Sequence, residues 1–196
     1  MNDLLYRRLF SDLPTLYTER LVLRRFRSDD LYDVNEYCSK EEVPRFLMWT
    51  PHLNLKETQG YLDFMMKRYR KGQNSDFAIA LQGSGKVIGN CGFTSVDLNH
   101  ECCELGYVLS SDYWGKGYMD EAFEALLAAA FDRLEAHRAV LRILDGNDHS
   151  VAFAIRHGFR KEGTEQNAFF VKGEYRTVHH FAMLKSEYLE RKQGIR

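Results

Sequence analysis

The chain has 196 residues and lacks the features that mark several classes of protein. It contains only three prolines, so there is no proline-rich linker, and no repeat or low-complexity segment is visible. No apolar run approaches the ~18 residues that a membrane span requires, and the N-terminus has no apolar stretch typical of a signal peptide. A formal net charge of -1 argues against binding of nucleic acid through phosphate neutralisation. These absences predict one soluble domain over residues 1–196, with its core at about 16–184 and neither membrane nor nucleic acid as a partner.

Cysteine is scarce as well. The four cysteines show neither the spacing of a metal site nor that of a disulfide framework. They are Cys38, Cys91, Cys102 and Cys103. The neighbours His179 and His180 face opposite ways if they lie in a strand, which suits a metal poorly. We therefore expect buried, reduced thiols in a cytoplasmic protein that holds no metal.

What the chain does contain is a regular alternation of strand and helix patterns. Alternation of apolar and polar residues indicates strands, and the segment at 139–144 indicates a short buried strand. Turns at 83–85 and 99–100 separate the three middle strands, and segments with a helical spacing of apolar residues separate the others. The strands are predicted at 19–26, 77–81, 87–96, 102–109 and 139–144, with a hairpin at 167–184 that turns at 172–174. Helices are predicted from Ser28, from Asn54 to Gly72, after Gly117, and over 148–157. This order predicts an α/β (α+β) fold, a mixed sheet with helices on both faces.

A glycine-containing loop, residues 113–119 (Tyr-Trp-Gly-Lys-Gly-Tyr-Met), joins a predicted strand to an amphipathic helix. Two glycines let the backbone approach a phosphate closely, and the start of the helix offers unpaired N–H groups and a positive dipole end. A Rossmann fingerprint would need glycine at Asp120, and a P-loop would need Gly-Lys-Ser/Thr. The loop therefore indicates either a different phosphate cradle or a tight strand-to-helix connection.

Five segments in register carry a resemblance to the GNAT acetyltransferase superfamily, most closely to its branch of ribosomal-protein N-terminal acetyltransferases. They are 19–24, 89–93, 104–109, 113–118 with 121–122, and 147–150 with 158–159. The resemblance implies a mixed, mostly antiparallel sheet of about seven strands. It also implies a V-shaped split between the fourth and fifth strands, which end at Leu109 and begin at Ala139.

The resemblance further implies that acetyl-CoA is the cosubstrate and lies in this split, with no metal. Its pantetheine arm would pair with the backbone near Val108 and Leu109 and would bond to Asn147. Its pyrophosphate would meet the backbone N–H groups of Gly115, Lys116, Gly117, Tyr118 and Met119. The family's usual glycine or alanine at the end of this loop is Met119 here.

Amide formation from a thioester requires a neutral amine, a polarised carbonyl and a proton for the departing thiolate. Glu104 is the candidate base, directly or through a water, because the resemblance places a glutamate there; Glu101 is a weaker candidate. Ser150 stands where this branch offers a proton donor, although a helix-start hydroxyl is an equal alternative. The tyrosine that many GNAT enzymes use is Ala154 here.

The resemblance also places acceptor contacts between the first two long helices and at the final hairpin. The candidates are Phe46, Met48, Trp49 and Tyr175, with plain packing as the alternative. An α-amino group has a pKa near ~8, against ~10.4 for lysine, so a single carboxylate suits an N-terminal amine better.

The predicted function is acetyl transfer from acetyl-CoA to a primary amine by direct attack in a ternary complex, most simply to the N-terminus of a ribosomal protein. A small amine, such as a polyamine or an antibiotic, is the alternative acceptor. A non-catalytic acyl-CoA-binding module is the alternative of another class. Dimers are common among relatives, so a homodimer is one assembly that the resemblance allows.

Overall fold

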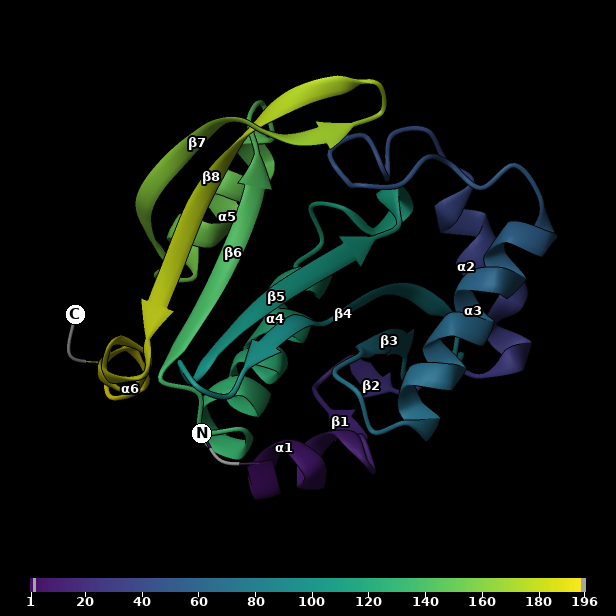
Figure 1. Cartoon of the computed structure of the whole chain (residues 1–196). Helices are drawn as coiled ribbons and strands as arrows, with labels where there is room; N and C mark the ends of the chain where they lie inside the picture. The colour runs from purple at the N-terminus through teal and green to yellow at the C-terminus, as the bar shows by residue number, and fades with distance from the viewer. Residues whose placement is uncertain (2, 195–196) are drawn as a thin grey trace.

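The computed structural model describes Met1 and residues 3–194, and its centre is a single eight-stranded sheet (Figure 1). The strand order is β1-β2-β3-β4-β5-β6-β8-β7. The strands are β1 Leu16–Tyr17, β2 Leu21–Arg24, β3 Asp76–Leu81, β4 Val87–Asp97, β5 Cys102–Leu109, β6 Arg138–Leu144, β7 Arg160–Val171 and β8 Glu174–Leu184. The predicted strand count of about seven is one short, because the two residues of β1 are too few to show an alternation.

The helices are α1 Asp3–Phe10, α2 Leu31–Cys38, α3 Leu55–Arg70, α4 Tyr118–Ala128, α5 Asp148–Arg156 and α6 Lys185–Lys192. The predicted cap of α3 is confirmed, since the Asn54 side chain accepts from the N–H groups of Lys56 and Glu57. The predicted helix start is confirmed as a 3₁₀ turn, Ser28–Asp30, that continues directly into α2, but the predicted capping hydroxyl of Ser28 is wrong. There the Asp30 carboxylate, and not Ser28, accepts the Arg27 N–H at 2.7 Å. α1 and α6 were not predicted, because eight residues give little periodicity to detect.

The helices cover both faces of the sheet, as predicted (Figure 1). On one face the α2–α3 pair packs against β4, where the Tyr37 hydroxyl donates to Asn90 Oδ1 at 3.1 Å. On the other face Phe10 of α1 meets Phe93 of β4, with ring centroids 5.3 Å apart. On that same face α4 and α5 lie against β5. The alternation of each strand therefore decides which helix layer its side chains meet.

All neighbouring strands are antiparallel except β5 and β6, which the crossover helix α4 makes parallel. Their pairing covers only Cys102–Glu104 against Arg138–Val140. Beyond these three residues β5 continues along β4 alone, while β6 follows β8 through Leu144. A register shift between Phe93 and Ser95 lies at the same level, and such a bulge bends a strand and increases its twist. The predicted split is thus present, between β5 and β6.

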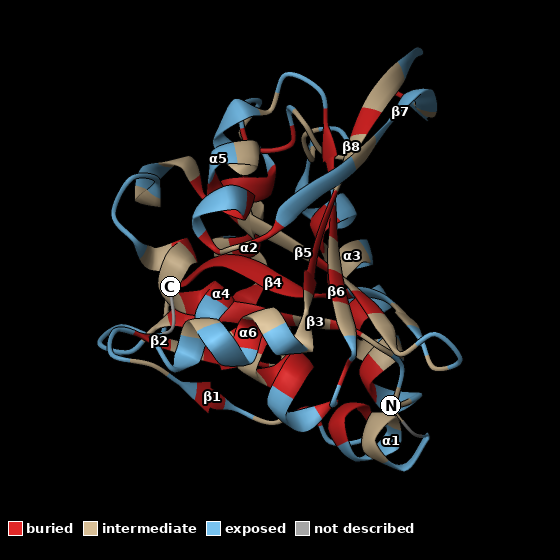
Figure 2. Ribbon diagram, turned by 90° about the vertical axis from the view of Figure 1, so that its left-hand side faces the viewer, coloured by how far each residue is buried: buried red, intermediate tan, exposed pale blue. Residues whose placement is uncertain are grey.

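The core lies on both faces of the sheet, where it meets α1, α4 and α5 on one side and the buried residues of α2 and α3, among them Tyr37 and Leu62, on the other. Figure 2 shows buried residues along β4 and β5 and on the inner side of α4, whereas the end of the β7–β8 hairpin is mostly exposed. This hairpin turns at Lys172 and Gly173, both with positive φ, as predicted. β7 begins earlier than predicted, at Arg160, because two register shifts against β8 interrupt its alternation.

The four cysteines are free, and three of them, Cys38, Cys91 and Cys103, are buried. Burial raises the pKa of each of these three thiols, to about 12 for Cys38. A thiol that stays protonated at neutral pH is a poor nucleophile. Within the described part of the chain no helix is long and apolar enough to cross a membrane. No group of three or more metal-ligating side chains is present there either.

Candidate active site

The split between β5 and β6 holds a cavity of about 90 Å³. One edge of β5 from Leu105 to Leu109 pairs with β4, and among the described strands nothing pairs with the other edge. The cavity is bounded by both strands, by the start of α5 and by the segment between α2 and α3. An open strand edge offers unpaired N–H and C=O groups, the surface on which an extended chain of amides can add as another strand.

The glycine loop follows directly from β5. Gly115 and Gly117 have φ of 70° and 76°, in the left-handed region that favours glycine, and Gly117 is the N-cap of α4. Among the described residues, none accepts a backbone hydrogen bond from the N–H groups of residues 115–119. The Met119 side chain is buried in the core and so points away from the loop. The loop therefore presents free backbone donors at the start of a helix, the arrangement that suits an anion.

Two side chains tie this loop to its surroundings. The Trp114 indole Nε1 donates to the Leu109 carbonyl at 2.8 Å, which fixes the loop against the end of β5 and occupies that carbonyl within the chain. The Lys116 ammonium donates to the Asp112 carbonyl at 2.6 Å and lies 5.5 Å from the centre of the Tyr113 ring. Its charge is held beside the loop.

The start of the sheet braces the same loop from outside. Arg20 donates from Nε to Glu121 Oε2 at 2.6 Å and from Nη1 to the Lys116 carbonyl at 3.0 Å. Its guanidinium lies 4.4 Å from the centre of the Tyr118 ring. Glu121 Oε1 also accepts from the Arg20 N–H at 2.7 Å and from Thr18 Oγ1 at 2.5 Å. Sequence reasoning missed this brace, although both partners lie in the quoted segments, because 101 residues separate them.

Glu104 lies on β5 at the point where the strands diverge, with its side chain 14% exposed. Its Oε2 accepts from Arg142 Nη2 at 2.6 Å, and the Ser95 hydroxyl lies 3.4 Å from the same oxygen. No described residue bonds to Oε1. Arg142 was not predicted; an arginine inside the strand predicted at 139–144 was the signal for it. Glu104 itself is not part of the cavity lining, which begins at the next residue, Leu105, but its partner Arg142 is. Glu101 lies in the β4–β5 turn with positive φ and is also outside the lining.

Asn147 and Ser150 stand at the start of α5, and both line the cavity. Asn147 is the N-cap: its Oδ1 accepts from the Ser150 N–H at 3.3 Å, while no described residue bonds to its side-chain N–H₂ group. The Ser150 hydroxyl forms no cap, so the helix-start alternative for this residue is not realised. Tyr107, which no motif indicated, lines the same cavity from β5.

The predicted acceptor residues divide into two groups. Phe46 lines the cavity. Met48 is 59% exposed and Trp49 packs on His52 with ring centroids 5.4 Å apart, and neither lines the cavity. Tyr175 is exposed near the end of the β7–β8 hairpin, outside the cavity lining. That hairpin reaches the segment between α2 and α3 (Figure 1), where Lys172 Nζ donates to the Pro44 carbonyl at 2.5 Å.

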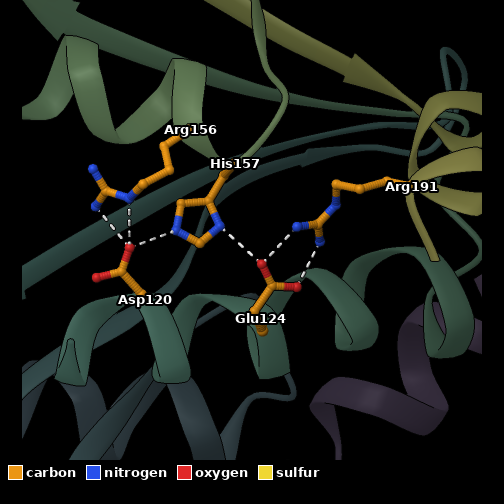
Figure 3. Close-up of polar contacts among 5 residues, drawn as sticks. All are labelled: Asp120, Glu124, Arg156, His157 and Arg191. Carbon is orange, nitrogen blue, oxygen red and sulfur yellow. Dashed lines mark hydrogen bonds and ion pairs between the residues drawn. The ribbon is translucent and has the colours of Figure 1, made fainter. Parts of the chain in front are cut away.

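A set of ion pairs joins the helices behind the site (Figure 3). His157, only 4% exposed, bridges Asp120 and Glu124 of α4 through its two ring nitrogens, at 3.1 and 2.9 Å. Arg156 adds a bond to Asp120 at 2.6 Å, and Arg191 of α6 adds bonds to Glu124 at 2.7 and 2.5 Å. The helix that begins at the glycine loop is thereby fixed to the helix that carries Ser150.

This fold and this split define an acetyltransferase of one known family. Residues 20–160 match the family model described as "Acetyltransferase (GNAT) domain", and the chain belongs to this family. It is therefore an acetyl-CoA-dependent N-acetyltransferase, and the alternative of a non-catalytic binding module is set aside. GNAT acetyltransferases use acetyl-CoA, the cosubstrate that the sequence analysis implied.

Named relatives and solved structures agree with this assignment. "Uncharacterized N-acetyltransferase p20" of Bacillus licheniformis is 31% identical over 90% of this chain and 99% of its own. "[Ribosomal protein uS5]-alanine N-acetyltransferase" of Escherichia coli is 26% identical (82% and 86%), and "Spermidine N(1)-acetyltransferase" of Vibrio cholerae is 21% identical (89% and 98%). Among structures, a GNAT acetyltransferase of Bacillus anthracis superposes with a TM-score of 0.79 at 25% identity (88% and 99%). The coenzyme A complex of RimL, a ribosomal L7/L12 alpha-N-protein acetyltransferase, shares the fold, with a TM-score of 0.78 at 21% identity (87% and 98%).

Proposed function

We propose that this enzyme acetylates the N-terminal α-amine of a protein, with Glu104 as the base. The observation that carries the proposal is the Glu104 carboxylate at the point where β5 and β6 diverge. One of its oxygens accepts from Arg142, which lines the cavity, and no described residue bonds to the other. One such carboxylate suits an amine whose pKa is near ~8 better than lysine at ~10.4. The relatives that act on ribosomal proteins support the same acceptor class.

The cofactor fits the residues around the split. The free N–H groups of residues 115–119 and the two left-handed glycines suit a pyrophosphate, which Gly115, Lys116, Gly117, Tyr118 and Met119 would hold through their backbone. The open edge of β5 near Val108 suits the amides of a pantetheine arm, as does the unpaired side-chain N–H₂ group of Asn147. The Leu109 carbonyl already accepts from Trp114, which leaves its second lone pair for the pantetheine arm.

Acetyl-CoA supplies an activated acetyl thioester, and the chain supplies the proton transfers and the orientation. Glu104 Oε1 would accept the proton of the amine, directly or through a water, while Arg142 holds Oε2 and fixes the carboxylate plane. A backbone N–H near Val108 would polarise the thioester carbonyl. The Ser150 hydroxyl, which does not cap the helix, would act as the proton donor to the departing sulfur. Phe46 would contact the acceptor at the mouth of the split.

Release of free thiol from acetyl-CoA tests the acceptor. The panel contains peptides with a free N-terminus and acetylated lysines, the same peptides with a blocked N-terminus and free lysines, and spermidine. We expect the highest kcat/KM with free N-termini. Faster turnover of the lysine peptides would refute the proposal, and faster turnover of spermidine would assign the enzyme to small amines, the acceptor class that the spermidine-acetylating relative favours.

Replacement of the base tests Glu104. We expect Glu104→Gln to lower kcat by ~10²–10⁴-fold near pH 7, with partial recovery as rising pH deprotonates the amine without help. Glu101→Gln, which makes the same change in the β4–β5 turn three positions before Glu104, is the matched control and should leave kcat unchanged. A decrease in kcat for Glu101→Gln alone would identify Glu101, and not Glu104, as the base.

A further inference from the structure

The hydroxyl of Tyr107 is buried and has no hydrogen-bond partner among the described residues. Buried polar groups in folded proteins are nearly always paired, so an exception needs an explanation. The ring itself is well held, with its centroid 4.7 Å from that of Phe153 and 5.6 Å from that of Phe123. The unpaired hydroxyl is thus kept in place by packing and not by a bond of its own.

This hydroxyl belongs to a residue that lines the cavity of the split beside Ser150 and Asn147. Tyr107 follows Glu104 by three positions on β5, so the two side chains leave opposite faces of the strand. Glu104 is on the face of α2 and α3, and Tyr107 is on the face of α4 and α5. A group bound in the cavity would meet Tyr107 from the face of α4 and α5, while Glu104 lies on the opposite face, just outside the cavity lining.

We propose that the Tyr107 hydroxyl donates a hydrogen bond to the sulfur of the cofactor and stabilises the thiolate as it departs. The inference rests on the proposed function, because it assumes that the thioester occupies this split. It adds a second hydroxyl on the sulfur side, next to that of Ser150, because position 154, where a tyrosine would stand in many relatives, is a fully buried alanine. Tyr107 reaches the cavity from the strand instead of from the helix.

The chemistry balances with Tyr107 as a donor that keeps its proton. The amine nitrogen forms the C–N bond, its proton passes to Glu104 or water, and the C–S bond breaks with its electron pair going to sulfur. Burial raises the pKa of Tyr107 to about 12, and the nearby Ser150 side chain opposes this rise, although no hydrogen bond of ordinary geometry joins the two hydroxyls. A thiol has a pKa near ~8.5, so the proton favours tyrosine over sulfur by ~10³-fold. The thiolate then takes its proton from solvent.

The variant Tyr107→Phe tests the proposal, because it keeps the ring and removes only the unpaired hydroxyl. Calorimetry at pH 9 compares two ligands, CoA and desulfo-CoA, which lacks the thiol. We expect the variant to bind CoA ~10- to 100-fold more weakly, as for a lost hydrogen bond to a charged group, and to bind desulfo-CoA as before. The Tm of the free protein should stay the same or rise, and kcat should fall. Equal losses for both ligands, or no loss for either, would overturn the proposal.

Tyr188→Phe is the matched control. Tyr188 lies on α6, away from the split, and its hydroxyl donates to Asp132 at 3.0 Å. This variant should therefore lower the Tm and leave both affinities unchanged. The wild-type protein gives a second test that needs no folded variant: its preference for CoA over desulfo-CoA should grow as pH rises through ~8.5. A pH-independent ratio would also refute the inference. A protein that binds neither ligand would instead refute the proposed function.

Discussion

The ion pairs of Figure 3 allow one prediction to be worked out in numbers. Glu124 is partly buried, and burial alone would raise the pKa of its carboxyl. Hydrogen bonds from His157 and Arg191 outweigh this effect and lower the pKa from its ordinary 4.5 to about 2. At ~1.36 kcal/mol for each pH unit this difference corresponds to about 3 kcal/mol. Because the side chain is 46% exposed, solvent screening reduces the contribution to roughly 1–2 kcal/mol.

The perturbation is Glu124→Gln, which keeps the size of the side chain and removes its charge. The folded-state pKa is depressed, so the contribution of Glu124 is fully present above pH 4.5 and is lost as pH falls towards 2. We therefore expect the variant to be less stable than the wild type by about 1–2 kcal/mol at pH 7, a decrease in Tm of roughly 2–8 °C. The difference should shrink as pH falls below about 4.5.

Urea unfolding at a series of pH values from 3 to 7 measures this difference by linear extrapolation. Glu190→Gln on the exposed side of α6 makes the same chemical change at a side chain that no described residue pairs with, and it should cost little at any pH. A difference between wild type and Glu124→Gln that does not change with pH would mean that packing, and not charge, is responsible. Equal stability of the two proteins at pH 7 would show that solvent screening cancels the ion pairs entirely.

Three further variants probe the site through its supports. Arg20→Gln removes the brace of the glycine loop and should raise the KM for acetyl-CoA by about 10-fold with kcat nearly unchanged; an equal fall in kcat would argue for general misfolding. Gly89→Ala would place a Cβ 2.2 Å from the Val108 carbonyl and should cost about 1–3 kcal/mol in urea unfolding, together with weaker CoA binding; a stable variant with normal binding would contradict the close packing of β4 and β5. Lys172→Met frees the β7–β8 hairpin from the Pro44 carbonyl and should raise the KM of the amine a few-fold, while that of acetyl-CoA stays constant.

The elements that the sequence predicted correctly are those with a strong local signal. Strand patterns located β3, β4 and β5, and a short buried run located β6. Helical spacing located α3 and α4, and glycines marked the turns of the loop and of the last hairpin. The short elements β1, α1 and α6 were missed because tertiary contacts, rather than their own periodicity, stabilise them. For α6 such a contact is the stacking of Tyr188 on Phe131.

The candidate site likewise contains residues that the sequence identified and residues whose position only the structure shows. Glu104, Asn147, Ser150 and the loop residues were named from segments of the sequence. Of these, Asn147 and Ser150 line the cavity, Glu104 lies where β5 and β6 diverge, and the loop joins β5 to α4. Their assigned roles stay predictions. Met48, Trp49 and Tyr175 were also named, but they lie outside the cavity, because a loop's place on the chain does not decide which of its side chains turn inward.

By itself, the sequence determined the strand and helix order and the glycine loop, because these depend on residues a few positions apart. Only the tertiary structure decided which distant groups meet. It paired Arg142 with Glu104, closed Arg20 onto Glu121 across 101 positions, and left the Tyr107 hydroxyl unpaired beside Ser150. The register between strands and the packing of helices on each face set such contacts, and neither is encoded in any local pattern.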